Sequence, residues 1–517
     1  MAEQIVGSNS VCSLTRIWQI PWCEPGCFFL MSLARRSLTS ITWSSVANLA
    51  QLILLFIRSV LLSRWLPVEI FGIYAAAYAF IAITRIIPNF GMDGAFLHRA
   101  KQVQDEQQAA AVHFTLKTVL TIVWTVAMLI FAFLIPDTET TVALYVLIGT
   151  TAASHLMQTP FLILARRVVY RRIAIMHIVD AILTLSISLF LAQLGLWMDS
   201  PSLFLWALLC SHVITVILNI LFFYVWRPVW RPQFAWNKAS VRYFLSFGGR
   251  NMLSTLLVQL LDRIDDLWIA TYLGNEALGF YSRAYRFASY PREIVARPIT
   301  QVMQGTYAEL KDRRQQLSQA FFRSNAILVR TGFFAAGLMI LVAPEFIILL
   351  LTDKWLPMLG VFRLMLVFIL LDPLKMTVVH LMVAMGDAAR PIPIRLLQLA
   401  ILLIGLFVLG PLYGIEGVVI SVNIMLVVGT FLFFRQARDY VDFSPFKLFA
   451  FPTIAVIIGV IAGWAVLYVP GLPDSEWWTA AAKIAVFVPL YASVLVLFER
   501  NETLALVKNA YKQVRQG

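Results

Sequence analysis

The chain has 517 residues, of which 60% are hydrophobic and only 13% are charged, and its mean hydropathy is +0.79. Soluble domains carry about 25% charged residues, so this composition excludes a soluble protein of this length. The net charge of +13 does not indicate nucleic-acid binding. The basic residues lie in short loops between apolar runs, and they form no basic stripe interleaved with aromatic residues.

The sequence contains neither the cysteine spacing of a metal site nor a glycine-rich motif that would bind a nucleotide. The four cysteines are Cys12, Cys23, Cys27 and Cys210, and no metal-ligand spacing continues downstream of them. The chain contains no glycine-rich phosphate-binding loop followed by Lys and Ser or Thr, so we expect no intrinsic ATPase activity.

Apolar runs recur from residue 37 to residue 498 with only short breaks between them. Long continuous runs favour helices over the short alternating segments of a membrane barrel. Since a spanning helix needs about 20 apolar residues, we predict an all-α polytopic membrane protein of about fourteen transmembrane helices. The predicted spans are residues 38–62, 71–92, 113–135, 141–163, 173–195, 203–225, 243–271, 277–305, 322–351, 357–384, 394–411, 416–434, 448–469 and 478–498.

The charges of the loops predict the orientation of the chain in the membrane. With the N-terminus inside, the cytoplasmic loops and tails hold 25 Lys and Arg residues, whereas the outer loops hold only Arg64 and Lys354. Positively charged loops remain in the cytoplasm, so both termini are predicted to be cytoplasmic.

The start of the chain differs in character from the rest. Met31 begins the segment MSLARR, immediately before the first long apolar run, and we predict that translation starts there. The predicted regions are a cytoplasmic leader (1–36), an N-lobe of six helices (37–242), a C-lobe of six helices (243–446), two further helices (447–498) and a cytoplasmic tail (499–517).

The two predicted lobes contain an internal repeat at a spacing of 207 residues. Leu66, Glu69, Gly72, Tyr74, Ala77, Tyr78 and Phe80 match Leu273, Glu276, Gly279, Tyr281, Ala284, Tyr285 and Phe287, which is seven identities in fifteen gap-free positions. Six helices separate the copies, so they share one orientation and the repeat is parallel. Transporters with such repeats carry the substrate between two lobes that rock against each other.

The repeat segments resemble those of a known family. Residues 64–74 (RWLPVEIFGIY), residues 272–281 (YLGNEALGFY), the SRAYRF segment that follows them, and residues 298–323 are similar to Wzx-type O-antigen and exopolysaccharide flippases. That family belongs to the multidrug/oligosaccharidyl-lipid/polysaccharide (MOP) superfamily, which includes the MATE transporters. The resemblance covers nearly the whole chain from about Met31 onward.

The resemblance implies a function. It implies translocation of undecaprenyl-pyrophosphate-linked oligosaccharides from the cytoplasmic to the outer leaflet of the inner membrane, without catalysis and without a cofactor. It also implies a polymerase and a chain-length regulator as partners. It carries no site residues, because the family has no invariant catalytic motif.

Basic residues within the spans are candidates for substrate binding. A charged side chain inside a membrane faces a cavity or a partner. The candidates are Arg58, Arg85, Arg283, Arg286, Arg292 and Arg297. Arg85 and Arg292 occupy equivalent positions of the repeat, and Arg283, Arg286, Tyr290, Glu293 and Arg297 share one face of a predicted helix. Because Arg binds phosphate through two parallel hydrogen bonds, these residues point to an anionic cargo.

Three carboxylates lie in the predicted span 243–271, which precedes the span that contains Arg283. Asp262, Asp265 and Asp266 have two interpretations. They either neutralise Arg283 and Arg286, with Asp265 and Arg283 predicted at similar depth, or bind a coupling cation, H⁺ or Na⁺. Glu345 and Asp372 are expected to be interfacial or solvated by a cavity.

Three other functions compete with this prediction. A drug/cation antiporter of the same superfamily would share the fold, but carboxylates should dominate its cavity. A flippase for the peptidoglycan lipid precursor would share the charge pattern. A membrane prenyl- or glycosyltransferase is the remote alternative, since the segment 262–266 (DRIDD) is like an Asp-rich diphosphate motif but lies within a span.

Overall fold

The structure is a computed structural model, and it describes residues 47–98, 106–135, 137–166, 170–226, 228, 230–468 and 475–498. Every regular element within these ranges is helical, which confirms the predicted all-α class. The whole predicted leader (1–36), with Met31, and the whole predicted tail (499–517) lie outside the described residues.

The first half of the described chain forms helices of very different length. They are Ala47–Trp65, α2 (Val68–Thr84), α3 (Ile86–Asn89), α4 (Met92–His98), α5 (Glu106–Phe133), α6 (Thr138–Leu156), α7 (Gln158–Arg166), α8 (Tyr170–Met198), α9 (Pro201–Ile220) and the π-helical turn η1 (Leu221–Trp226).

The second half is equally helical. Its elements are α10 (Lys238–Tyr272), α11 (Asn275–Pro291), the π-helical turn η2 (Arg292–Ala296), α12 (Arg297–Glu309), α13 (Arg314–Phe346), η3 (Ile347–Leu351), η4 (Asp353–Met358), α14 (Leu359–Ala384), α15 (Pro391–Ala437), α16 (Pro445–Ala465), η5 (Val466–Tyr468) and α17 (Glu476–Phe498).

Residues with a side-chain acceptor begin several of these helices. Asp137 accepts a hydrogen bond from the backbone N–H of Thr140 (3.1 Å) and caps α6. Asn237 accepts from the N–H of Ala239 (3.0 Å) and caps α10. Such caps satisfy N–H groups that have no partner inside the first helical turn.

Within the described ranges, fewer helices are long and apolar enough to cross a membrane than the fourteen that the sequence predicts. Among the described residues, ten helices are long and apolar enough to cross a membrane, or up to eleven if the bent pair α6–α7, with an angle of 42°, is one span. α10 and α11 are not among them. α15 has 47 residues and is broken at Gly414, which has φ 58° and ψ −138°. The chain is a polytopic membrane protein, and the count of fourteen remains a prediction.

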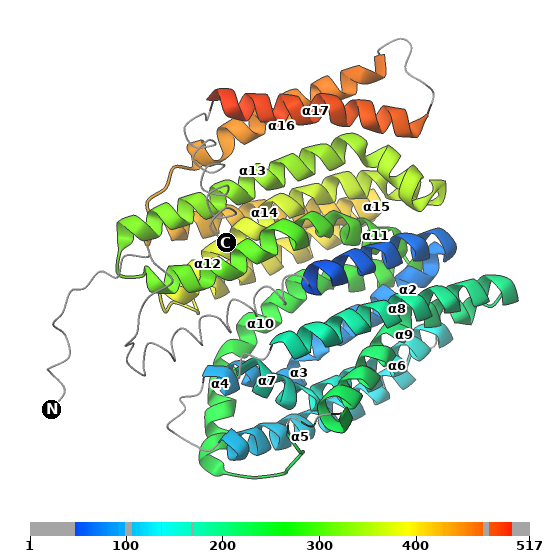
Figure 1. Cartoon of the computed structure of the whole chain (residues 1–517), viewed down its shortest axis with the longest axis vertical. Coiled ribbons are helices and arrows are strands. Elements are labelled where there is room, and N and C mark those ends of the chain that lie inside the picture. Colours follow the sequence, from blue (N-terminus) through cyan, green and yellow to red (C-terminus); the bar gives the residue numbers. More distant parts are fainter. Residues whose placement is uncertain are drawn as a thin grey trace, which may run out of the picture.

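The helices gather in two groups (Figure 1). α2 to α9 lie in one half of the view and α11 to α17 in the other, and α10 runs between them. The domain boundaries predicted from the sequence are compatible with this arrangement and remain predictions. α16 and α17 pack on α13 at the edge of the molecule.

α2 and α11 cross in close backbone contact, and the repeat explains why. A Cβ added at Gly72 would lie 1.7 Å from the carbonyl oxygen of Asn275, and a Cβ added at Gly279 would lie 2.3 Å from the carbonyl oxygen of Val68. Gly72 and Gly279 are equivalent repeat positions, as are Val68 and Asn275. The same contact is therefore made twice, once in each direction, and both copies require glycine because only a missing side chain permits this approach.

Two spans predicted as continuous helices are broken. The span predicted at 71–92 is helical through α2 and α3 as far as Asn89 and is interrupted there, and the span predicted at 141–163 is α6 and α7, which are bent by 42°. Phe90 and Gly91 then turn with positive φ (38° and 64°) and pack against Gly248 of α10. The sequence pattern missed these breaks because apolar residues continue through them.

A buried ion pair attaches α17 to α13. Lys483 and Glu345 form this pair, and each side chain is only 4% exposed. Lys483 also donates to the backbone carbonyl of Leu341 at 3.4 Å. The prediction that Glu345 is interfacial or cavity-solvated is wrong, because a basic residue on a distant helix neutralises it inside the bundle.

We expect Gly72→Ala to destabilise the protein, because its Cβ would overlap the carbonyl oxygen of Asn275. Forcing an extra carbon into a packed contact costs about 1–3 kcal/mol. Gly149→Ala is the matched control, since Gly149 lies within α6 and nothing lies within 4 Å of its added Cβ. Thermal unfolding of the two purified variants in detergent measures the difference, and equal melting temperatures would contradict the close contact.

We expect Lys483→Met to destabilise the protein strongly, because it leaves the buried Glu345 carboxylate without its partner. Removing one member of a buried ion pair costs about 3–5 kcal/mol. Adding Glu345→Gln to Lys483→Met should restore much of the loss. Thermal unfolding of the single and double variants tests this, and a double variant no more stable than Lys483→Met would show that the charge is not the cause.

Candidate functional site

A cavity of about 470 Å³ lies where both halves of the molecule meet. Its walls come from the helix Ala47–Trp65, α2, α9, α10 and α11. It brings together three of the six arginines predicted from the sequence, Arg58, Arg283 and Arg286, and adds Arg263. We call it the arginine cavity.

Neutral groups hold Arg58 in place. Its Nε donates to the hydroxyl of Ser188 (2.8 Å) on α8, and its Nη2 donates to the backbone carbonyls of Ala207 (3.1 Å) and Leu208 (3.2 Å) on α9. These bonds fix the guanidinium at the cavity wall without neutralising its charge.

The side chains of Arg283 and Arg286 make fewer hydrogen bonds than the side chain of Arg58. The guanidinium of Arg283 lies 4.2 Å from the ring centroid of Phe71, and its Nη1 donates to the hydroxyl of Ser59 (3.2 Å). Its Nε is buried and has no hydrogen-bond partner. Arg286 lies over the ring of Tyr290 at 5.0 Å. A buried N–H without an acceptor is costly, so Arg283 is suited to receive an acceptor from a ligand.

The arginine cavity has a strong excess of positive charge. Four arginines and one aspartate, Asp266, line it, which gives a formal net charge of +3 with His212 neutral. In the part of the chain that the structure describes, no carboxylate lies within 4.0 Å of Arg58, Arg283 or Arg286; Asp266 pairs with Arg263 at 3.0 Å. Positive charges in a low-dielectric setting repel one another, and a bound anion would relieve this repulsion.

One wall of the arginine cavity is aromatic and polar. The hydroxyl of Tyr74 and Nε2 of His212 are 2.8 Å apart, and the rings of Tyr74 and Tyr78 are stacked at 6.1 Å. Arg263 lies over Tyr78 at 5.2 Å. The cavity therefore offers hydrogen-bonding and ring surfaces beside its charged groups, as a site for a large polar cargo requires.

The predicted pairing of Asp265 with Arg283 is wrong. Asp265 instead accepts a hydrogen bond from the hydroxyl of Tyr281, and its other oxygen, Oδ1, is buried without a partner. Asp262 and Asp265 line a small separate cavity of about 20 Å³. Asp266 does not contact Arg283 or Arg286 and is paired with Arg263, which lies one helical turn before it.

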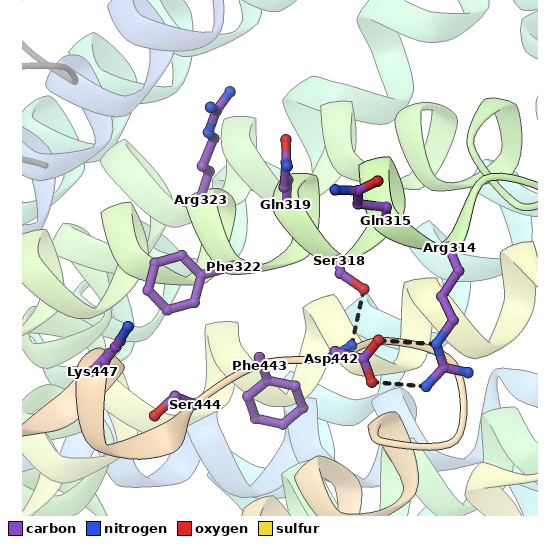
Figure 2. A pocket seen from close by; sticks show the side chains of 10 residues that line it. All are labelled: Arg314, Gln315, Ser318, Gln319, Phe322, Arg323, Asp442, Phe443, Ser444 and Lys447. Atoms are coloured by element: carbon purple, nitrogen blue, oxygen red, sulfur yellow. Dashed lines mark hydrogen bonds and ion pairs between the residues drawn. The ribbon is translucent and has the colours of Figure 1, made fainter.

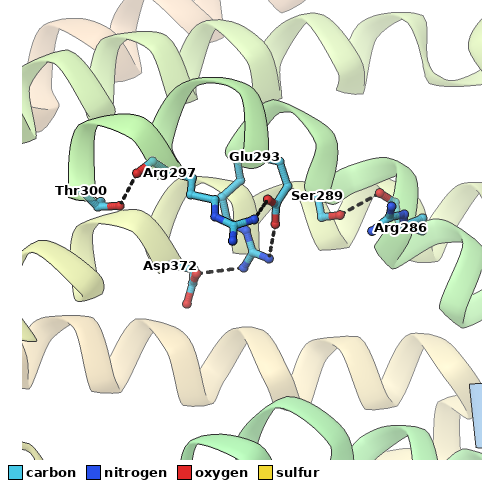
Figure 3. A network of polar contacts seen from close by, with 7 residues as sticks. Arg286, Ser289, Glu293, Arg297, Thr300 and Asp372 are labelled. Carbon is cyan, nitrogen blue, oxygen red and sulfur yellow. Dashed lines mark hydrogen bonds and ion pairs between the residues drawn. The ribbon is translucent and has the colours of Figure 1, made fainter. Parts of the chain in front are cut away.

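Arg292 and Arg297 belong to a different cavity, of about 280 Å³, together with Asp262. Their charges are paired there: Arg292 contacts Asp372 (2.9 Å). Arg297 contacts Glu293 (2.8 Å), and both are labelled in Figure 3. Lys375 also contacts Asp372, at 2.9 Å. Asp372 was expected to be interfacial or cavity-solvated, and it is the centre of this ion-pair network.

The predicted common face of Arg283, Arg286, Tyr290, Glu293 and Arg297 does not persist along the helix. α11 ends at Pro291, and the π-helical turn η2 (Arg292–Ala296) follows. A π turn adds a residue to one turn and rotates every later side chain relative to the earlier ones. Arg283 and Arg286 therefore face the arginine cavity, whereas Arg292 and Arg297 face the second one.

Arg85 lies in neither cavity. It is half-buried where α2 ends, as Arg292 stands where α11 ends, so the repeat relates the two helix breaks. Among the described residues, the side chain of Arg85 has no hydrogen-bond or ion-pair partner, whereas the side chain of Arg292 is paired with Asp372. The predicted equivalence holds for the backbone and not for the contacts.

Another pocket lies at the end of the bundle predicted to be cytoplasmic (Figure 2). It measures about 570 Å³ and lies between α13 and the loop before α16. Arg314 contacts Asp442 through two hydrogen bonds (3.1 and 2.9 Å), and hydrogen bonding to this guanidinium is the main cause that lowers the pKa of Asp442. Its charged pair is already satisfied and exposed, so we do not assign the cargo site here.

Sequence reasoning missed a buried polar cluster in the first half of the chain. Lys117 and His113 of α5 are fully buried and both contact Asp93, at 2.7 and 3.3 Å. Lys117 also donates to Asn89 (3.0 Å). The four-residue spacing of His113 and Lys117 places them on one helical face, and that spacing was the available signal. Arg263 was likewise visible three residues before Asp266. No cluster of His, Cys, Asp and Glu suited to a metal ion occurs within the described ranges.

Comparisons with known proteins agree with this architecture. A family model described as polysaccharide biosynthesis protein matches residues 61–360. The chain is 22% identical to the lipopolysaccharide biosynthesis protein WzxC of Escherichia coli K12 over 411 residues, 78% of this chain and 81% of that protein. It is 24% identical to the succinoglycan biosynthesis transport protein ExoT of Rhizobium meliloti over 324 residues, 60% of this chain and 62% of that protein.

Solved structures share the fold. The lipid II flippase MurJ in an inward closed conformation aligns with a TM-score of 0.71 at 13% identity, over 90% of this chain and 99% of that chain. An inward-facing MATE multidrug resistance transporter of the MOP superfamily aligns with a TM-score of 0.55 at 15% identity, over 77% of this chain and 99% of that chain. At these identities the alignments establish a shared fold and not the cargo.

Proposed function

The chain belongs to the family of polysaccharide biosynthesis proteins, and on that premise we propose that it is a flippase for lipid-linked oligosaccharides. The cargo is an oligosaccharide repeat unit attached to undecaprenyl pyrophosphate, carried from the cytoplasmic to the outer leaflet for the synthesis of a surface polysaccharide. The names of its relatives WzxC and ExoT support this assignment.

The unneutralised charge of the arginine cavity is the observation that carries the proposal. Pyrophosphate is a multiply charged anion, and Arg binds such groups through paired hydrogen bonds. Arg58, Arg283 and Arg286 present guanidinium groups without carboxylate partners among the described residues, and Arg283 retains an unused buried donor. A pyrophosphate would supply the negative charge and the acceptor that the cavity lacks.

The proposed transport cycle uses the two halves of the molecule as rigid bodies. The lipid-linked sugar enters from the predicted cytoplasmic end, its pyrophosphate contacts the arginines, and its polyprenyl chain stays in the bilayer. The halves then separate at the opposite end and release the head group there. The proposed location is the inner membrane with both termini in the cytoplasm, as the loop charges predict.

The protein itself need not form or break a covalent bond in this cycle. We propose that it is not an enzyme and that a polymerase and a chain-length regulator act on the delivered repeat units. These partners rest on the resemblance to Wzx-type flippases.

A cationic-drug antiporter is the rival within the same fold. Its cavity should carry net negative charge, whereas the arginine cavity carries a formal charge of +3. A lipid II flippase shares the preference for a pyrophosphate lipid, and the similarity to MurJ establishes only the fold. The family match favours polysaccharide repeat units over lipid II.

We expect Arg283→Gln to reduce translocation about tenfold or more, because a hydrogen bond to a charged group is lost together with one cavity charge. The measurement uses proteoliposomes that contain the purified protein and a lipid-linked oligosaccharide. Access of a lectin or glycosidase to the head group reports transfer between leaflets. Arg242→Gln, an exposed residue of α10 outside the cavity, is the matched control.

The same assay separates the competing functions. Loss in Arg283→Gln with normal activity in Arg242→Gln supports an anionic cargo in the arginine cavity. If the wild-type protein moved no glycan lipid and instead exchanged cationic dyes for H⁺ or Na⁺, the antiporter reading would replace this one.

We also propose Asp262, Asp265 and Asp266 as the site that couples transport to H⁺ or Na⁺. The buried oxygen of Asp265 without a partner supports this role, since a proton or cation would satisfy it. We expect Asp265→Asn to abolish the response of translocation to an imposed pH or Na⁺ gradient, while Asp312→Asn, in an exposed loop, preserves it. A gradient response unchanged in Asp265→Asn would rule out Asp265 as the coupling group.

A further inference from the structure

The two basic residues at the predicted outer end both bridge the halves of the molecule. Lys354 of η4 donates through Nζ to the backbone carbonyls of Arg64 (2.9 Å) and Leu66 (2.8 Å). Arg64 donates in return through Nη2 to the carbonyl of Leu349 (2.8 Å) in η3. Arg64 and Lys354 are the two basic residues that the sequence places in outer loops, against the positive-inside distribution. Each of them binds a backbone carbonyl of the other half of the molecule.

These contacts satisfy helix ends. The last carbonyls of a helix have no partner within it and attract a cation. The helix Ala47–Trp65 ends at this point, and Lys354 caps it from the other half of the chain. Leu349 lies in the π-helical turn that ends the α13 segment, and Arg64 binds there. Each half therefore caps a helix C-terminus of the other half.

Trp355 completes the contact. Its indole Nε1 donates to the carbonyl of Ser63 (2.8 Å), and its side chain is fully buried. It packs edge-on against Phe71 (5.6 Å between ring centroids) of α2 and Phe280 (5.9 Å) of α11. The preceding Thr352 has φ 97°, a conformation that residues other than glycine adopt only when their surroundings impose it.

We infer that Lys354 and Trp355, bound to residues 63–66, form a clasp that closes the outer end, and that Arg283 controls it through Phe71. The glycine crossing of α2 and α11 lies next to this clasp in the chain and closes the same end. Opening toward the outside must break all of these bonds, whereas the arginine cavity remains available from the other end.

Phe71 connects the clasp with the arginine cavity. One ring contacts both sites: the guanidinium of Arg283 lies 4.2 Å from its centroid, and Trp355 packs against its edge. Arg283 also binds Ser59, one helical turn before Ser63, whose carbonyl receives the Trp355 bond. An anion that draws Arg283 toward the cavity would remove both supports of the clasp. Cargo binding would thereby favour outward opening.

This inference rests on the proposed function for the identity of the anion, and on the contacts alone for the clasp. The test uses the purified full-length protein in lipid nanodiscs, with its four native cysteines replaced and Leu66→Cys added as reporter. Leu66 is fully buried beside the clasp, so its reaction with a bulky maleimide measures opening. Nanodiscs expose both sides, so the result does not depend on the predicted orientation.

The first comparison tests the clasp. Trp355→Phe keeps an aromatic ring but removes the N–H donor together with the rest of the indole, so labelling of the reporter should accelerate by roughly fivefold or more, fivefold being the factor for one hydrogen bond of average strength. Lys354→Met should have an effect at least as large, since it removes two bonds. Asp353→Asn, an exposed neighbour, is the control and should label at the rate of the unmodified clasp. Unchanged labelling in both clasp variants would overturn the inference.

The second comparison tests the connection to the cavity, with undecaprenyl pyrophosphate as the probe. The lipid should accelerate labelling in the otherwise wild-type protein and in Phe280→Leu, and clearly less in Phe71→Leu, where only the contact through Ser59 remains. Both substitutions remove an aromatic contact with Trp355, and only Phe71 touches Arg283. Equal acceleration in the two variants would overturn the role of Phe71.

Binding of the lipid, measured on the same samples by thermal stabilisation, separates the two proposals. Lipid that binds without accelerating labelling contradicts the control by Arg283. Lipid that does not bind contradicts the proposed cargo, and the clasp is then judged on Trp355→Phe and Lys354→Met alone.

Discussion

A positively charged side chain inside the membrane destabilises a protein unless an anionic group neutralises it. The two cavities of this chain show the two ways in which that demand is met. In the second cavity, Arg292 and Arg297 have carboxylate partners on the same or a neighbouring helix. In the arginine cavity, Arg58 and Arg283 are held by hydroxyls, carbonyls and an aromatic ring, none of which neutralises them. The cavity of Arg292 and Arg297 is therefore neutralised without a ligand, whereas the arginine cavity favours a bound anion.

The position of the arginine cavity follows from how the halves meet. α2 and α11 touch through two glycines that the repeat places at equivalent positions, and no side chain separates the backbones at that end. Farther along the same helices, Tyr74 and Arg283 point into open space between the halves. A contact that is tight at one end and open toward the other produces a cavity that is closed on one side, as alternating access requires.

The clasp and the arginine cavity are linked by Phe71, which belongs to the repeat-bearing helix of the first half. Since Trp355 and Arg283 come from the second half, Phe71 is in contact with it at two points. Backbone carbonyls, rather than carboxylates, receive Lys354 and Arg64. Such bonds to helix ends are individually modest, which suits a contact that has to open in every transport cycle.

Composition and periodicity were sufficient to predict several features of this protein. Apolar runs of spanning length predicted helices, the parallel repeat predicted related halves, and the arginines at 58, 283 and 286 were identified because charge is rare in such runs. The tertiary structure alone decided the partners of these charges. The π turn after Pro291 places Arg292 and Arg297 in another cavity, because its one added residue rotates every side chain that follows. Asp265 pairs with Tyr281, and Glu345 with Lys483 some 138 positions away. Neither hydropathy nor spacing records which distant helices pack together, and that packing determines which charges remain free for a ligand.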